Sequence, residues 1–171
     1  MKALKKYLGW IAVACAVVAV IACALPFFKQ VESGAEATAS GFTLMFGGNY
    51  VMKAGGMKME MEKYFGFSVM NLLPLLLVVA GAVCAYLGKK NGNKIMNYVA
   101  IGCFAVAAIL FFCAVSCAQM GSYFKDMSVT KEMWKESLKD VDLGIGAVLA
   151  GIVSLVGAAA VAVDTFVPVK E

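Results

Sequence analysis

The segment Met57–Met61 reads Met-Lys-Met-Glu-Met and is the sharpest candidate for chemistry in the chain. Thioether sulphurs are soft ligands that suit Cu(I), and strict alternation places Met57, Met59 and Met61 on one face of a strand. The segment is therefore a candidate Cu(I) site. The plainer alternative is that these methionines form the apolar face of a strand that lies on a helix bundle.

Six cysteines suggest redox chemistry, but all of them lie inside apolar stretches. A thiol in hydrocarbon stays in its unreactive protonated form, so we expect neither thiol chemistry nor structural disulfides. The chain also contains no histidine and no arginine. Without the usual general base, and with no phosphate-binding loop or nucleophile elbow, the sequence predicts a protein that is not an enzyme and has no cofactor.

Four apolar stretches must position these residues. Each has 21 to 26 residues and no Asp, Glu, Lys, Arg or His, and about 20 helical residues cross a bilayer. We therefore predict an all-α membrane protein, a four-transmembrane-helix bundle formed by one domain (1–171), with a small extracytoplasmic antiparallel β element in the first outer loop. The predicted spans are 8–28, 64–88, 95–120 and 143–163, with outer loops 29–63 and 121–142 and an inner loop 89–94.

The distribution of lysine predicts the orientation. Segments 1–7 and 89–94 each carry three lysines and no acid, whereas acids balance the lysines of the two longer loops. Positive residues beside a span stay on the cytoplasmic side. We therefore expect a multi-pass protein of the cell membrane with both termini in the cytoplasm. The net charge of +4 forms no single patch, which excludes nucleic acid as a partner. A basic complement made only of lysine indicates an AT-rich, bacterial genome.

The first apolar stretch has a second interpretation, because a basic start followed by an apolar run also fits a cleaved secretory signal. Ala22-Cys23-Ala24 matches a small-x-small cleavage site, and Val20–Cys23 resembles a lipoprotein box. The apolar run has 21 residues, however, where a signal needs about 7–15. We expect this segment to be retained as a span, with cleavage as the alternative.

Small residues recur four positions apart in the apolar stretches, which lets helix backbones approach closely. Pro74 should kink the second span because it removes a backbone donor. Asn71 lies one turn earlier, near the expected depth of Ser116, and predicts an interhelical hydrogen bond or, alternatively, a polar substrate or gate site. The small-residue pairs are Ala147 with Gly151, Gly81 with Ala85, and Cys15 with Ala19.

Both outer loops contain local patterns. In the first loop, apolar residues alternate between glycine turns, which predicts hairpin strands with their apolar face on the helix ends. The small polar segment Ser33–Ser40 predicts a flexible lead-in. In the second loop, residues 130–141 predict an interfacial helix with Trp134 at headgroup level. The predicted strands are Gly41–Phe46, Tyr50–Lys53 and Met57–Met61.

The order of spans and loops resembles the claudin-like and tetraspan arrangement of animal membrane proteins. The resemblance covers the topology of the whole chain, but the first loop has neither the Trp and paired cysteines of claudins nor the Cys-Cys-Gly of tetraspanins, so no functional residue carries over. From the residues themselves we expect a scaffold, accessory or self-associating protein that acts through its outer loops. Its partners would be the lipid bilayer and a second copy or another membrane protein. The alternative is a transporter or channel component, with copper as its specific cargo.

Overall fold

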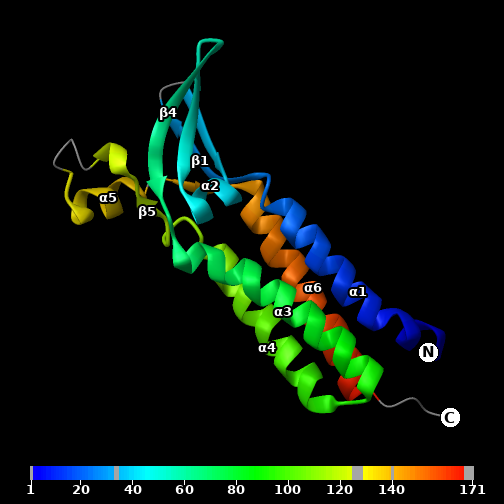
Figure 1. The fold of residues 1–171 in the computed structure, drawn as a ribbon. Coiled ribbons are helices and arrows are strands. Elements are labelled where there is room, and N and C mark those ends of the chain that lie inside the picture. Colours follow the sequence, from blue (N-terminus) through cyan, green and yellow to red (C-terminus); the bar gives the residue numbers. More distant parts are fainter. Residues whose placement is uncertain (1, 33–34, 125–128, 140, 168–171) are drawn as a thin grey trace.

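The structure is a computed structural model that describes residues 2–32, 35–124, 129–139 and 141–167. A four-helix bundle forms one end of the molecule and a β-sheet forms the other (Figure 1). Helix α1 packs against α3 and α6, and α4 packs against the same two helices, so the four helices form a closed ring. Their bounds are α1 Lys2–Ala22, α3 Val69–Asn91, α4 Lys94–Phe112 and α6 Ile145–Phe166.

The helices carry the signature of a multi-pass membrane protein. Helices α3, α4 and α6 are long and apolar enough to cross a membrane, and the apolar part of α1, Tyr7–Ala22, is shorter. Their outward faces are aliphatic, with Leu76, Ile109 and Ile152 each at least half exposed. Helices that are apolar all round are stable against hydrocarbon rather than water.

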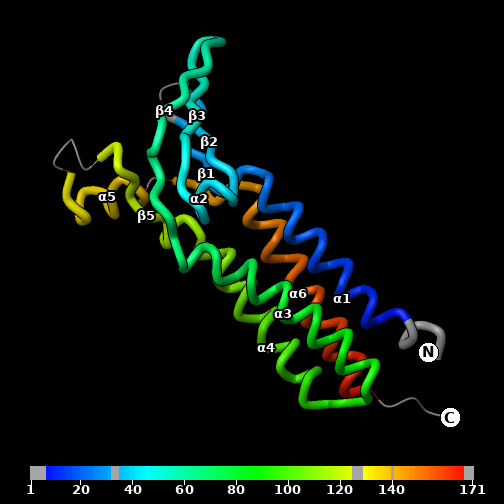
Figure 2. The backbone as a smooth tube through the Cα atoms, in the orientation of Figure 1, coloured from blue at the N-terminus to red at the C-terminus, as the bar shows by residue number. Residues whose placement is uncertain are grey.

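Capping residues set the ends of these helices. The Ser68 hydroxyl accepts the Asn71 backbone N–H at 3.3 Å, which starts α3. Gly92 ends that helix in the left-handed region, with φ of 64°, and the Asn93 side chain accepts the Ile95 N–H to start α4. Because only two residues separate α3 from α4, the two helices are antiparallel neighbours, as the traced backbone shows (Figure 2).

The sheet is a six-stranded antiparallel half-barrel with the strand order β5-β4-β3-β2-β1-β6. Four strands lie between α1 and α3 in the chain, and two short ones lie between α4 and α6. The strands are β1 Pro26–Glu32, β2 Ala35–Ser40, β3 Gly48–Ala54, β4 Met57–Gly66, β5 Gln119–Met120 and β6 Asp142–Leu143. Short helices α2 (Gly41–Phe46), η1 (Ser122–Phe124) and α5 (Lys131–Ser137) complete the outer part.

The prediction of an all-α fold is wrong, because the outer part is a full sheet and not a small β element. Side chains alternate across this sheet. Phe28, Ala37 and Tyr50 are buried on the concave face. On the opposite face Lys29 and Glu36 form an ion pair at 3.1 Å.

The apolar stretches predicted as spans extend beyond the helices. Helix α1 ends at Ala22, ahead of Pro26, which cannot continue a helix and instead starts β1. Phe27, Phe28 and Phe65 are no more than 2% exposed and fill the interior between sheet and bundle. Hydrophobicity alone cannot distinguish such core residues from residues that face lipid. For the same reason α3 begins at Val69 and α4 ends at Phe112, whereas the predicted spans began at 64 and ended at 120.

Two local predictions in the first outer loop are also wrong. Gly41–Phe46 is the helix α2 and not a strand, with its first turn capped by the Ser40 hydroxyl. The adjacent residues Leu44 and Met45 are both fully buried, which a strand with alternating faces does not favour. The expected flexible lead-in forms strand β2 from Ala35 onward, and residues 33 and 34 lie outside the described residues.

The helix predicted in the second outer loop is confirmed over Lys131–Ser137, with Thr130 as its cap. Trp134, however, is not an exposed anchor, because only 6% of it is accessible. Its indole N–H donates to the Ala118 carbonyl at 3.1 Å, and its ring packs on Tyr64 and Phe124.

One aromatic side chain lies at the centre of the bundle. Phe104 of α4 is fully buried, and its ring lies against Gly81 of α3 on one side and Gly157 of α6 on the other. A Cβ atom added at either glycine would come within 3.2 Å of the Phe104 ring. The two glycines therefore allow three helices to pack around one phenyl group.

Candidate functional site

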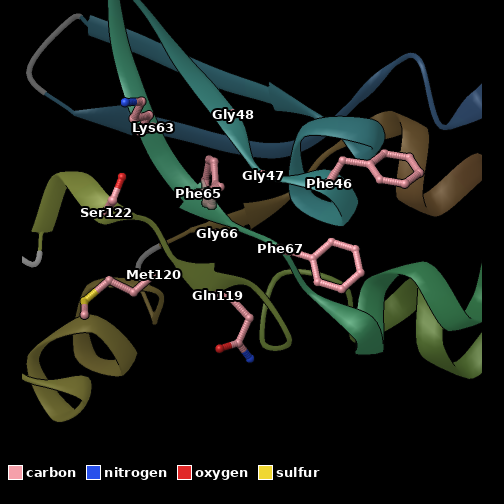
Figure 3. A pocket seen from close by; sticks show the side chains of 10 residues that line it. All are labelled: Phe46, Gly47, Gly48, Lys63, Phe65, Gly66, Phe67, Gln119, Met120 and Ser122. Atoms are coloured by element: carbon pink, nitrogen blue, oxygen red, sulfur yellow. The ribbon is translucent and has the colours of Figure 1, made fainter.

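A hollow of about 490 Å³ lies where the sheet meets the outer ends of the helices, and we call it the junction hollow. The segment from α2 to β3, the end of β4, and β5 with the residues after it surround this space (Figure 3). Phe46 and Phe67 lie on one side of it, and Lys63 and Ser122 lie on the other, with Gln119 below. The junction hollow therefore has an apolar side and a polar side.

Close backbone contacts at two glycines fix the walls of the junction hollow. Gly47 has φ of 79°, and a Cβ atom there would lie 2.9 Å from the Phe65 carbonyl oxygen. A Cβ atom at Gly66 would lie 2.6 Å from the Met120 carbonyl oxygen. Glycine at these positions lets α2 and β5 approach β4 closely enough to enclose the space.

The charge of the junction hollow is positive. Lys63 stands at the bulge of β4, where the register with β3 shifts, and it has φ of 55°. The Lys63 backbone N–H donates to Asn49 Oδ1 at 3.3 Å, which holds this bulge. None of the described lining residues carries a carboxylate, whereas Lys63, Gln119 and Ser122 supply hydrogen-bond donors. The arrangement suits a negatively charged or neutral polar group.

Ser68 and Asn71 form the joint between sheet and bundle. The Ser68 hydroxyl donates to the Cys117 carbonyl at 2.8 Å, and the Ser68 N–H donates to the Met45 carbonyl at 3.0 Å. The Asn71 amide donates to the Leu44 carbonyl at 3.5 Å. Both side chains are at most 2% exposed. The start of α3 is thus bonded to α2 above it and to the turn after α4 beside it.

Asn71 therefore bonds to α2, an element of the outer part, rather than to a second span. Its Oδ1 atom has no hydrogen-bond partner among the described residues. A buried carbonyl in this state costs about 1–3 kcal/mol, a penalty that a bound water would relieve. Ser116, the other predicted polar residue, is exposed in the turn that follows α4.

The structure places Met57, Met59 and Met61 on one face of β4. Met57 flanks the turn at the tip of the β3–β4 hairpin, whereas Met61 lies farther down, opposite Tyr50. Met57 is 74% and Met59 58% exposed, while Met61 is partly buried against the core. The ladder sets Met52 of β3 directly opposite Met59. Three sulphur-bearing side chains, those of Met52, Met57 and Met59, therefore lie near one another on this face.

The six small residues predicted at helix contacts are all buried within the bundle. The buried alanines are at most 3% exposed, and a Cβ atom at Gly151 would lie 2.7 Å from the Phe112 ring. The described part of the chain contains no disulfide and no cluster of three His, Cys, Asp or Glu side chains fit to hold a metal. The six small residues at the helix contacts are Ala147, Gly151, Gly81, Ala85, Cys15 and Ala19.

An aromatic cluster lies beside the junction hollow, under the sheet. Tyr64 stacks on Tyr50 with ring centroids 4.4 Å apart and contacts Phe124 and Trp134. Burial raises the pKa of the Tyr64 hydroxyl, and the nearby Tyr123 hydroxyl raises it further. The cluster therefore favours the neutral phenol.

Sequence reasoning did not identify Lys63, Gln119 or Ser122. Lys63 is far from Gln119 and Ser122 in the chain, and neither segment contains a motif. The pair Gly47-Gly48 between apolar runs was the one available signal, because glycine pairs mark close turns. No profile of a known protein family matches the sequence, and neither does any curated protein.

Proposed function

We propose that the chain is a non-enzymatic, four-span protein of the cell membrane that acts through its outer sheet by associating with a second copy of itself. A scaffold or accessory role would follow from such association. The proposal rests chiefly on the outer edge of β4, which is open to another strand and has a self-complementary sequence.

The placement of charge supports the four-span topology. Lys89 and Lys90 lie in the last turn of α3, at the end of the bundle that is opposite the sheet (Figure 1). Lys89 Nζ also lies 4.0 Å from Asp164 Oδ2 of α6, and this ion pair joins the two helices at the same end. The positive-inside rule assigns this end to the cytoplasm and the sheet to the exterior. An even number of spans then leaves both termini inside.

Strand β4 pairs with β3 from Met57 to Phe65, but it pairs with β5 only at Phe65 and Gly66. Among the described residues, the outer edge of 57–63 therefore has no strand partner. The turn Gly55-Gly56 has two positive φ angles, 56° and 85°, as two-residue hairpin turns require. Ala54 and Met57 flank this turn as a hydrogen-bonded pair, so the backbone groups of 58 and 60 face the open edge. Such an edge is a template for another strand.

The sequence Met-Lys-Met-Glu-Met is complementary to itself when it is paired antiparallel about Met59. Lys58 then faces Glu60 of the second copy, and Glu60 faces its Lys58. Met57 and Met61 face each other in the same way, and the outward backbone groups of 58 and 60 form the hydrogen bonds. Opposite charges and matched apolar pairs each favour such a ladder by about 0.2–1 kcal/mol.

Cysteine crosslinking tests this register. Met59→Cys should form a disulfide-linked dimer under mild oxidation, because the two residues 59 would stand directly opposite each other at about 4.5 Å between Cα atoms. Met57→Cys and Met61→Cys chains should each remain monomeric when oxidised alone. A mixture of the two should crosslink, since the register pairs 57 with 61.

The controls are the parent, which retains its native cysteines, and Lys53→Cys, an exposed residue of β3 on the opposite face of the hairpin. Neither should give the dimer above background. Equal crosslinking of Lys53→Cys and Met59→Cys, or none from Met59→Cys together with a monomer in mild detergent, would show that this edge does not pair copies.

Copper handling is the second candidate function, and the position of Met52 opposite Met59 favours it. Together with Met57 these residues offer three soft ligands on one face of the hairpin, where Met57 and Met59 are exposed and Met52 packs against the core. A titration with Cu(I) tests the idea against the variant Met57→Leu/Met59→Leu/Met61→Leu. Equal affinity of parent and variant would exclude a copper site here.

A further inference from the structure

We propose that the junction hollow binds the negatively charged, phosphate-bearing headgroup of a membrane phospholipid. This inference is independent of self-association, because it uses the bundle end of β4 and not the open edge at 57–61. Three features of the junction hollow support it: the hydrogen-bond donors in its lining, its position at the outer ends of α3 and α4, and the exposed apolar face of α3 that continues from it.

The donors suit a phosphate. Lys63 and Ser122 lie on the same side of a space of about 490 Å³, and no described lining residue is acidic (Figure 3). Gln119 lines the lower side, with its amide directed away from these two residues. Hydrogen bonds between a cation and phosphate oxygens are about twice as strong as neutral ones. The volume admits a headgroup that is larger than a bare phosphate ion.

The depth suits the interface of the outer leaflet. Phe67 lies directly before the Ser68 cap of α3, and Gln119 follows the turn after α4. The junction hollow therefore lies where these two helices leave the hydrocarbon. Headgroups occupy the remaining thickness there, because a bilayer of ~40–45 Å contains a hydrocarbon core of ~30 Å.

The apolar side continues down the bundle, and this favours a lipid over a soluble phosphate. Phe46 and Phe67 are 56% and 55% exposed. Below them Met70, Leu73 and Leu76 follow at three-residue spacing on the exposed face of α3. A phospholipid with its headgroup in the junction hollow can lay its acyl chains along this face, whereas a soluble phosphate would leave the rings and this face uncovered.

The test uses the full chain, purified in mild detergent, with equal amounts of phosphatidylglycerol and phosphatidylcholine. Native mass spectrometry counts the lipid that the protein retains. We expect the parent to retain phosphatidylglycerol preferentially and Lys63→Gln to retain about tenfold less, which corresponds to the loss of one charge-assisted hydrogen bond. Lys58→Gln is the matched control, because it removes the same charge from the same strand outside the junction hollow.

A second variant separates a lipid site from general attraction between charges. Phe67→Gln leaves the net charge unchanged and should also lower retention, since the ring flanks the acyl path. Glycerol phosphate, which has the headgroup chemistry without the chains, should not compete at equal concentration. No preference for phosphatidylglycerol, equal losses in Lys63→Gln and Lys58→Gln, an unchanged Phe67→Gln, or full competition by glycerol phosphate would each overturn the proposal.

Discussion

The glycines around Phe104 allow a quantitative test of how the bundle packs. Gly81→Ala adds a methyl group 3.2 Å from the Phe104 ring, where ordinary contacts are about 3.5–4.0 Å. The ring cannot move away, because it is fully buried and Gly157 holds its other side. Overpacking of this kind costs about 1–3 kcal/mol.

Gly102→Ala is the matched control in α4, since a Cβ atom there meets nothing within 4 Å. Both substitutions gain the same helix propensity, about 0.5–1 kcal/mol, so the difference between them isolates the steric term. We expect Gly81→Ala to be less stable than Gly102→Ala by about 1–3 kcal/mol.

Reversible unfolding in mixed detergent micelles measures these free energies. Phe104→Leu in the Gly81→Ala background should recover part of the loss, and a double-mutant cycle should give a coupling of at least about 0.5 kcal/mol. Gly151→Ala provides a contrast. Its added methyl would lie closer to a ring, 2.7 Å from Phe112 Cζ, but Phe112 is 42% exposed and can turn into lipid. If Gly81→Ala and Gly102→Ala agree within about 0.5 kcal/mol, the tight packing inferred around Phe104 is refuted.

Three further predictions concern the outer part and the topology. Ser68→Ala should destabilise the protein by about 2–4 kcal/mol in the same unfolding assay, because it removes a helix cap and the hydrogen bond to the part-buried Cys117 carbonyl. Thr130→Ala, at the cap of the exposed α5, should cost about 1 kcal/mol or less. Because the folded-state pKa of Tyr64 is raised, its contribution to the free energy of unfolding should be complete below about pH 10 and should be lost as pH rises through the folded pKa. In unfolding curves measured at alkaline pH, the stability of Tyr64→Phe should decline less steeply than that of the parent. Identical slopes would contradict this cause. A reporter fused after Lys170 should be active only in the cytoplasm, and activity outside would reverse the proposed orientation.

The membrane class of the chain could be predicted from the sequence because long apolar helices have an unambiguous length and composition. The limits of the helices could not be predicted in the same way. Phe28 and Phe65 are as apolar as residues that face lipid, yet both rings are buried under the sheet, with their centroids 5.3 Å apart. Only the fold tells which apolar residues face the bilayer and which face the protein.

The outer sheet shows a second limit of sequence reasoning. Met57–Met61 could be predicted as a strand because its alternation has a period of two. Gly41–Phe46 shows a similar alternation but forms a helix, because the Ser40 cap and the burial of Leu44 and Met45 decide the local conformation. The candidate site depends on contacts between β4 and residues 119–122, more than fifty positions away, which no local pattern encodes.

The joint at Ser68 and Asn71 has a mechanical consequence. Since these two buried side chains connect α3 to α2 and to the turn after α4, a force applied at the hairpin tip reaches the helices without an intervening flexible linker. Tilting of the sheet would therefore tilt α3 within the lipid.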